Sequence, residues 1–363
     1  MDNKFFVSTG EVSGDLHLSY IVKSISKLDP KCKFFGVAGK HSGEAGVNII
    51  QNIDDLAIMG FVEVVKKYSF LKRKAREYVD FIKKEHIEKV ILVDYGGFNL
   101  KFMELLKKEA PRVKIYYYIP PKLWVWGEKR IEKLKLADHI IVIFPWEVEF
   151  YKKYEVNAVY YGNPFYEKYH YQERTGDCVL LLPGSRKQEV ESIFPIMEKY
   201  MEISPEKKFI LKLSNRDHLK WIKGDLKRHK NLKVELEGSL KNCVKKSEVA
   251  VATSGTVTLE LALMGIPTVV VYKTSILNEL IARLFIKFTY VSLPNLVLGR
   301  EVFPELLQRE CNPKEIKLAV NRILDNKEKV NNEIQKVRDA LPGKNILDKY
   351  GEFILRGHED GKI

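Results

Sequence analysis

The stretch "FFVSTGEVSGDLHLS" (residues 5–19) decides the fold class. It opens on an apolar run, Phe5-Phe6-Val7, passes through a turn that contains glycines, and continues with apolar residues at helical spacing from Leu16 to Leu28. A strand, a glycine turn and a helix in this order are typical of a Rossmann-like unit, in which the turn usually binds phosphate. This turn instead carries two carboxylates, Glu11 and Asp15.

The same alternation of short apolar runs and helix-length segments recurs along the chain. Continuous runs of this kind predict parallel strands that are buried on both faces. The runs are Phe5–Ser8, Phe34–Ala38, Val90–Asp94, Val113–Ile119, Ile140–Phe144, Val179–Pro183, Phe209–Leu213, Val234–Leu236, Val249–Thr253 and Thr268–Tyr272.

The series of runs restarts after a polar, turn-rich stretch from Gly162 to Gly176. We therefore predict an α/β protein with two doubly wound parallel-sheet domains, residues 1–168 and 169–342. A last helix, at about residues 343–363, is expected to pack back on the first domain.

The composition is that of a globular protein, with 363 residues, 45% of them hydrophobic and 30% charged. The four cysteines are far apart in the sequence, which disfavours a zinc site or a disulfide framework and fits a reducing cytoplasm. No apolar run approaches the roughly 18 residues that a membrane span needs, and the N-terminus does not resemble a signal peptide.

The formal net charge of +13 suggests anionic partners, such as nucleic acid, phosphorylated substrates or an anionic membrane. A lysine-rich set of solvated helix faces explains the charge equally well.

Two loops of the second domain have the chemistry of anion sites. Gly184-Ser185-Arg186 follows one predicted strand, and Ser254-Gly255-Thr256 follows another and begins a helix. Small residues at a helix N-terminus favour a phosphate, and Glu260, one turn further on, could accept both hydroxyls of a ribose. The alternative is an ordinary turn with a surface arginine, followed by an ordinary capped helix.

In the first domain, Asp94 ends a predicted strand, where a carboxylate can serve as a general base. It could equally cap the next helix. Trp124 and Trp126 would share one face of an extended segment, where indoles can stack on sugar rings or acyl chains. Alternatively, the pair belongs to the core.

The stretch "MGFVEVVKKYSFLKRKAREYVDFI" (residues 59–82) has apolar residues at helical spacing with lysines and arginines between them. Such a helix can lie in a membrane interface or cover a core with a solvated basic face. The expected membrane contacts are Phe61, Val64, Val65, Tyr68 and Leu71. Residues 276–288 form a second, similar segment.

Taken together, the motifs resemble those of the lipid-A-disaccharide synthases, glycosyltransferase family 19. The resemblance rests on Gly10-Glu11-Val12-Ser13-Gly14-Asp15, Met59-Gly60-Phe61-Val62-Glu63-Val64, Leu182-Pro183-Gly184-Ser185-Arg186, Ser254-Gly255-Thr256 with Glu260, and "VSLPNLVLGREVFPELLQ" (residues 291–308). No single motif is specific, but the set occurs in the family's order over nearly the whole chain.

The resemblance implies a GT-B architecture, with two Rossmann-like domains facing each other across a cleft. It implies an inverting transfer, without metal or cofactor, from UDP-2,3-diacylglucosamine to 2,3-diacylglucosamine 1-phosphate. The products would be the β(1→6) lipid A disaccharide 1-phosphate and UDP. It further implies a cytoplasmic enzyme, peripheral on the anionic surface of the inner membrane, that does not bind nucleic acid; a homodimer is left open.

Carried over by position, the resemblance makes Asp94 the candidate base, with Glu11 as the second candidate. It places Ser13, Asp15, Asn99 and Trp124 on the acceptor side, and it places Asn295 with Arg186, Ser254, Gly255, Thr256 and Glu260 on the UDP-sugar side. The chain departs from the family pattern at Gly97, Pro120, Lys122, Gly127 and Asn163, and these departures cluster on the acceptor side.

Two other classes of protein share parts of this pattern. One is another GT-B enzyme, such as a UDP-GlcNAc 2-epimerase or the undecaprenyl-linked transferase of peptidoglycan synthesis. The other is a non-catalytic protein that binds nucleotide sugars or nucleic acid. Nucleic-acid binding would need aromatic residues among the basic ones, and the basic runs here are mainly aliphatic.

Overall fold

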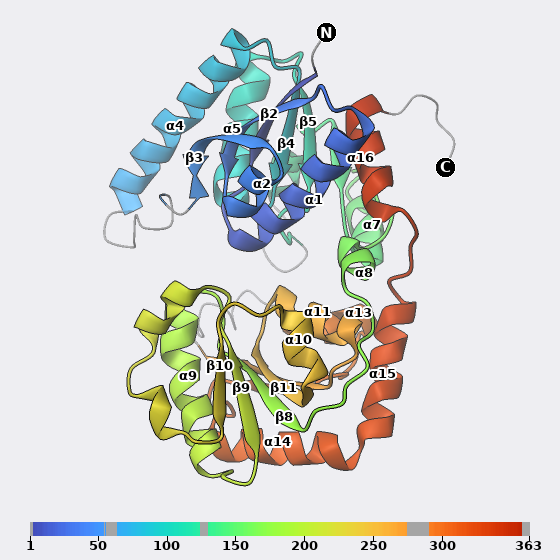
Figure 1. Cartoon of the computed structure of the whole chain (residues 1–363). Coiled ribbons are helices and arrows are strands. Elements are labelled where there is room, and N and C mark those ends of the chain that lie inside the picture. Colours follow the sequence, from blue (N-terminus) through green and yellow to red (C-terminus); the bar gives the residue numbers. More distant parts are fainter. Residues whose placement is uncertain (1–2, 54, 56–63, 124–129, 274–289, 358–363) are drawn as a thin grey trace. The chain divides into compact units, whose positions relative to one another are not determined.

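The computed structural model describes residues 3–53, 55, 64–123, 130–273 and 290–357. The chain forms two units (Figure 1). Unit 1 comprises Met1–Pro164 and Gly343–Ile363, and unit 2 comprises Phe165–Pro342. Each unit is built around one parallel sheet, which needs helices on both faces because its strands are apolar on both sides.

The sheet of unit 1 has the strand order β3-β2-β1-β4-β5-β6-β7, and all neighbouring strands are parallel. The order runs outward in both directions from β1 and β4, as in a Rossmann-like fold. The strands are β1 Lys4–Ser8, β2 Lys33–Ala38, β3 Val47–Asn52, β4 Lys89–Val93, β5 Lys114–Tyr118, β6 His139–Ile141 and β7 Ala158–Val159.

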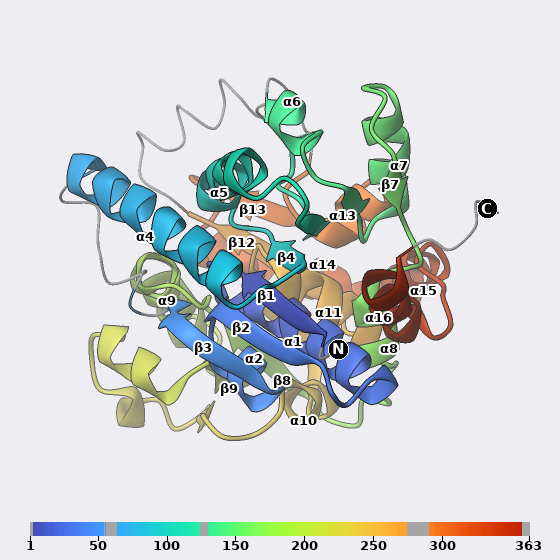
Figure 2. The same cartoon turned by 90° about the horizontal axis from the view of Figure 1, so that it is seen from above.

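Helices cover both faces of this sheet. Successive residues of β5 show the alternation: Tyr117 belongs to the core under α4 and α5, whereas the ring of Tyr118 lies 5.6 Å from that of Tyr350 on α16. Figure 2 shows α4 crossing one face while α1 lies on the other. The helices of unit 1 are α1 Val12–Leu28, α2 Lys40–Glu44, α4 Val64–Lys84, α5 Gly96–Glu109, α6 Ile131–Leu134, α7 Pro145–Lys152 and α16 Ile346–Arg356; α8, Pro164–Lys168, begins at the boundary.

Helix α16 packs closely against α1, although more than 300 residues separate them in sequence. The Ser24 hydroxyl donates a hydrogen bond to the Leu347 carbonyl at 2.9 Å, and Lys27 pairs with Asp348 at 2.8 Å. A Cβ atom on Gly351 would lie only 2.2 Å from the Ser24 hydroxyl oxygen, so the two helices meet where one of them has no side chain.

Unit 2 repeats the plan with the strand order β10-β9-β8-β11-β12-β13, again all parallel. One core lies under α9 and α14, and a second lies on the opposite face, where α10 and α11 pack. The strands are β8 Cys178–Leu182, β9 Lys208–Lys212, β10 Leu232–Glu235, β11 Ser247–Thr253, β12 Thr268–Tyr272 and β13 Glu305–Leu307. The helices are α9 Lys187–Glu202, α10 Leu240–Lys245, α11 Thr256–Met264, α13 Leu293–Leu298, α14 Pro313–Asp325 and α15 Lys327–Asp339, with 3₁₀ turns at Arg216–Trp221 and Leu226–Arg228.

The predicted fold class of two parallel-sheet α/β domains is confirmed. Each predicted apolar run overlaps a strand, and the strands that the sequence did not predict are β3, β7 and β13. Strand β3 lies at the sheet edge with Ile49 and Ile50 exposed, and β7 and β13 are only 2 and 3 residues long, so none of them shows as a buried apolar run. Over the described residues, every helix is too short or too polar to cross a membrane.

Candidate active site

In each unit, the two loops singled out in the sequence follow neighbouring strands. The strand order of unit 1 changes direction between β1 and β4, which are followed by the Glu11 loop and by Asp94. In unit 2 it changes between β8 and β11, which precede Gly184–Arg186 and Ser254–Thr256. Ligands of open α/β sheets bind at such switch points. The topology therefore places the candidate residues where a ligand site of each unit is expected.

Asp94 sits in an unusual turn between β4 and α5. Asp94 and Tyr95 both have positive φ angles, 47° and 50°, which side-chain-bearing residues seldom adopt. The turn is fixed through the Asp94 carbonyl, which accepts hydrogen bonds from the Tyr117 hydroxyl at 2.8 Å and from Asn99 Nδ2 at 3.0 Å. The backbone of a half-buried Asp94 is thus held rigidly at the end of its strand.

Asn99, predicted on the acceptor side, makes its hydrogen bonds to other parts of unit 1. The side chain is fully buried on α5. Its Oδ1 accepts a hydrogen bond from the Ser8 hydroxyl at 2.7 Å, and its Nδ2 donates to the carbonyls of Ser8, Val93 and Asp94. Asn99 therefore joins the ends of β1 and β4 and positions the Asp94 turn.

The Tyr95 ring connects this turn to the first loop. A Cβ atom on Gly10 would lie 2.2 Å from the Tyr95 ring, so only glycine fits there. Burial raises the pKa of Tyr95, and the negative charge of Glu11 raises it further. Glu11 is exposed at the N-cap of α1, where its side chain makes no capping hydrogen bond, and Ser13 is half-buried in the first turn. The structure thus brings Glu11 and the Asp94 turn to the same end of the sheet.

Asp15, also predicted on the acceptor side, is bonded to the backbone at the start of α2. Its residue is only 1% exposed. One carboxylate oxygen accepts the Gly39 N–H at 2.8 Å and the other accepts the His41 N–H at 2.9 Å. Asp15 therefore satisfies N–H groups at the start of α2.

The Gly184–Arg186 loop of unit 2 already holds an anion of its own. Glu189, in the first turn of α9, accepts the N–H groups of Ser185 at 3.0 Å and Arg186 at 3.2 Å through one oxygen. Gly184 has a φ of +119°, and a Cβ there would meet the Glu189 side chain. These two backbone N–H groups therefore already have an acceptor without a phosphate. The Arg186 side chain pairs with Glu189 at 3.4 Å and is 62% exposed.

The N-terminus of α11 differs from that of α9. Its N-cap residue is Gly255, which has no side chain to accept a hydrogen bond from the first turn. Gly255 has open space where a Cβ would be, and Thr256 is half-buried. The Ser254 hydroxyl donates to the Val291 carbonyl at 3.0 Å, so it supports the loop. The positive end of the helix dipole favours an anion here.

Asn295, predicted on the UDP-sugar side, is buried on α13. Its Oδ1 accepts the N–H groups of Val302 and Phe303, and its Nδ2 donates to the Phe303 carbonyl and to Glu305. Glu305 in turn accepts from the backbone of Val291 and Ser292 at 2.9 Å. This network fixes the segment whose Val291 carbonyl supports Ser254.

Glu260 lies in the second turn of α11 with an altered acidity. Burial raises the pKa of its carboxyl group to about 7, and a hydrogen bond from the Tyr169 side chain lowers that pKa in part. A carboxylate with a pKa near neutrality changes charge under physiological conditions.

The predicted membrane contacts are only partly within the described structure. Phe61 and Trp124 lie outside the described residues, as does the segment 276–288. Val64, Val65 and Tyr68 belong to α4, whose side chains are described from residue 69 onward. Leu71 is the one member of the predicted membrane contacts whose side chain is described. It is partly buried and packs against the core of unit 1.

Tyr95, Glu189, Glu305 and Tyr169 are the site residues that the sequence did not suggest. Only Glu189 had a recognisable signal, since a glutamate three residues after an N-cap is typical of a capping box. Among the described residues, no group of three or more His, Cys, Asp or Glu side chains could hold a metal ion.

Comparison with known proteins assigns the chain to a family. The family model for lipid-A-disaccharide synthetase matches residues 5–347. The lipid-A-disaccharide synthase of Persephonella marina is 31% identical, covering 97% of this chain and 98% of the relative. That of Syntrophus aciditrophicus is 32% identical, covering 93% and 94%.

A solved structure shows the same fold in a more distant protein. The UDP-GlcNAc 2-epimerase of Neisseria meningitidis bound to UDP-GlcNAc superposes with a TM-score of 0.59 at 12% identity, over 97% of this chain and 99% of the other. Such a likeness extends to the architecture alone, whereas the family match covers the motifs at both switch points. The chain therefore belongs to the lipid-A-disaccharide synthetase family and is a glycosyltransferase.

Proposed function

We propose that the protein transfers 2,3-diacylglucosamine from UDP to the 6-hydroxyl of 2,3-diacylglucosamine 1-phosphate. The acceptor oxygen attacks C1 of the donor, the bond from C1 to the diphosphate oxygen breaks, and the hydroxyl proton passes to a base. Attack opposite the leaving group inverts C1 and gives a β(1→6) disaccharide 1-phosphate and UDP. The family match supports the choice of substrates.

The observation that carries this proposal is the contrast between the two switch points. That of unit 1 carries carboxylates, Glu11 and Asp94, and that of unit 2 carries the N-terminus of α11, whose N-cap residue is a glycine. A carboxylate can accept the proton of a hydroxyl, and a helix N-terminus can stabilise the negative charge of a departing diphosphate.

We assign the base to Asp94 and the leaving group to unit 2. Asp94 is the better candidate because its turn is fixed by Tyr117 and Asn99. Glu11 then orients the acceptor. In unit 2, α11 and the exposed Arg186 guanidinium hold the diphosphate, with Gly184, Ser185 and Ser254 shaping the two loops, while Glu260 holds the ribose. The sequence has no D-x-D motif, so we propose that the helix dipole takes the electrostatic role of a metal.

The proposal is tested by incubating the purified protein with both acylated sugars and analysing the products by mass spectrometry and NMR. We expect one disaccharide 1-phosphate with a β(1→6) linkage. Formation of the 2-epimer from UDP-GlcNAc, or a product from unacylated UDP-glucosamine alone, would assign the protein to another activity with the same fold.

We also propose that the enzyme works at the cytoplasmic surface of the inner membrane, where acylated substrates reside. Helix α4 supports this, because Lys72, Arg73 and Arg76 are exposed on it. Changing these three residues to glutamate should release the protein from vesicles that contain anionic lipid. Light scattering of the same samples decides between a monomer and a homodimer.

A further inference from the structure

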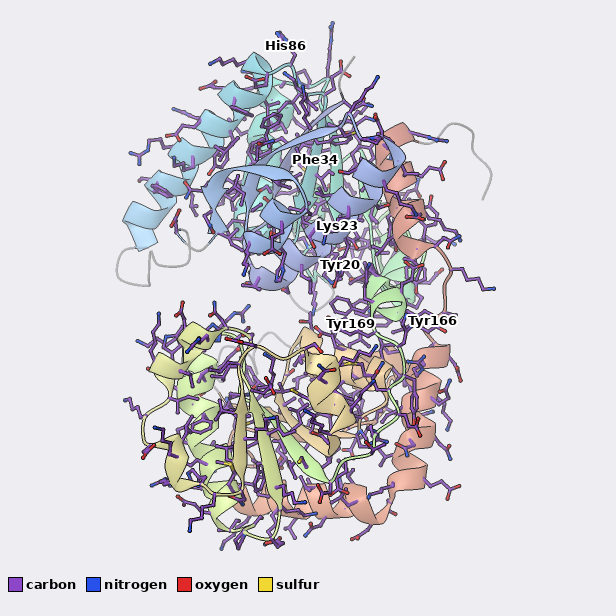
Figure 3. All side chains as sticks on the ribbon, in the orientation of Figure 1. Tyr20, Lys23, Phe34, His86, Tyr166 and Tyr169 are labelled. Carbon is purple, nitrogen blue, oxygen red and sulfur yellow. The ribbon has the colours of Figure 1, made fainter. Side chains whose placement is uncertain are left out.

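Tyr169 contacts Glu260 of α11 from a segment that lies outside this helix. Tyr169 directly follows α8, the helix that contains Tyr166, at the start of unit 2 (Figure 3). The side chain of Tyr169 makes a hydrogen bond to the Glu260 carboxyl group, and that bond favours the ionised form of the glutamate. An ionised carboxylate can only accept hydrogen bonds, so the Tyr169 hydroxyl is the donor of this one.

The Tyr169 ring is held in place by packing. It packs against the core on the α11 side of the unit 2 sheet, and its centroid lies 5.3 Å from that of the buried Phe165, nearly perpendicular to it. The Tyr169 N–H donates to the Phe165 carbonyl at 2.8 Å. The hydroxyl is therefore presented from a fixed ring.

The segment is also fixed on the far side of Tyr169. The Gln172 N–H donates to the carbonyl of Met264, the last residue of α11, at 3.0 Å. The Tyr171 ring lies on Gly265, where a Cβ atom would come within 2.4 Å of it. These contacts tie the segment to the helix that carries Glu260.

We propose that Tyr169 is a positioning residue for the nucleotide, because its hydroxyl orients the Glu260 carboxylate toward the ribose and so makes unit 2 selective for ribonucleotides over 2′-deoxyribonucleotides. The inference rests on the proposed function, in which Glu260 holds the ribose of UDP. One carboxylate accepts a hydrogen bond from the tyrosine and keeps capacity for the hydroxyls of the sugar. Without the tyrosine, the carboxyl group can rotate and more readily takes up a proton, which turns an acceptor into a donor.

The test compares the binding of UDP and 2′-deoxy-UDP by isothermal titration calorimetry. In the unchanged protein we expect UDP to bind at least about tenfold more tightly, since a hydrogen bond to a charged group is being lost. Tyr169→Phe should lower the affinity for UDP about tenfold and that for 2′-deoxy-UDP, which keeps only the 3′-hydroxyl contact with Glu260, by a smaller factor, so that the discrimination shrinks. Glu260→Gln should remove the same discrimination, and the double variant should lose no more.

Tyr166→Phe is the matched control. Tyr166 lies three residues earlier, and its ring is under the Arg338 guanidinium at 5.9 Å. This variant should keep the discrimination of the unchanged protein. An equal loss of affinity for both nucleotides in Tyr169→Phe would show a merely structural role, and unchanged discrimination would also overturn the inference. If the unchanged protein binds no UDP, the proposed function itself fails.

Discussion

At the scale of the residue, the proposed reaction depends most on Asp94, the proposed general base. Asp94→Asn keeps the shape of the turn, because Tyr117 and Asn99 bind the backbone carbonyl and not the side chain. We expect turnover to fall by about 10²–10⁴-fold, as for loss of a general base, with UDP affinity retained. Glu11→Gln is the control and should raise the KM for the acceptor more than it lowers kcat. Should Glu11→Gln abolish turnover while Asp94→Asn keeps it, the base is Glu11.

Glu260 makes a second residue-scale prediction, about stability and pH. Its pKa in the folded protein, about 7, is above the ordinary value of 4.5, so folding favours the protonated form. This contribution is fully present below pH 4.5 and is lost as the pH rises through about 7, by up to about 3 kcal/mol. Glu260→Gln, which cannot ionise, should therefore gain stability relative to the unchanged protein between these pH values in urea unfolding. A difference that stays constant with pH would show that the carboxyl group is not desolvated.

At the scale of the element, the N-termini of α9 and α11 look alike in sequence and differ in structure. Glu189 occupies the first, and no N-cap side chain closes the second. Glu189→Ala should lower the free energy of unfolding by about 1–2 kcal/mol, because two backbone N–H groups lose their acceptor. UDP affinity should hardly change, whereas Thr256→Pro, which is tolerated at the first helical position but removes its backbone N–H, should weaken UDP binding. Tighter UDP binding by Glu189→Ala would mean that the α9 loop is also a phosphate site.

The same contrast shows how far the sequence predicts the site. Strand-end position and residue type single out Asp94, Glu11 and the α11 loop as candidates, since parallel strands bring their carboxyl ends to one edge. Residue type could not tell a polar side chain that faces a ligand from one that ties two loops together. Asp15, Asn99 and Asn295 have every chemical feature of ligand-binding residues, yet each is buried and bonded to backbone. Their partners are distant in sequence, so no local pattern reveals them.

At the scale of the whole molecule, unit 1 depends on a helix from the other end of the chain. Truncation after Pro342 removes α16, which covers α1 and places Tyr350 beside Tyr118. We expect hydrogen exchange to rise throughout α1 and β5 while β8 and β11 stay protected. Leu318→Ala is a suitable control because this side chain is 62% exposed on α14 and should change neither unit. Unchanged protection of α1 in the truncated protein would show that α16 does not stabilise unit 1.

The place of α16 also sets an order for biosynthesis. Unit 2 is one continuous stretch, Phe165–Pro342, and can close its core as soon as it has left the ribosome. Unit 1 is begun first but receives its last helix only after unit 2 has been translated. During that interval the side of α1 that later packs against α16 is exposed to solvent. The nascent chain is therefore most prone to aggregation before its final twenty or so residues appear, and chaperones should bind it in that window.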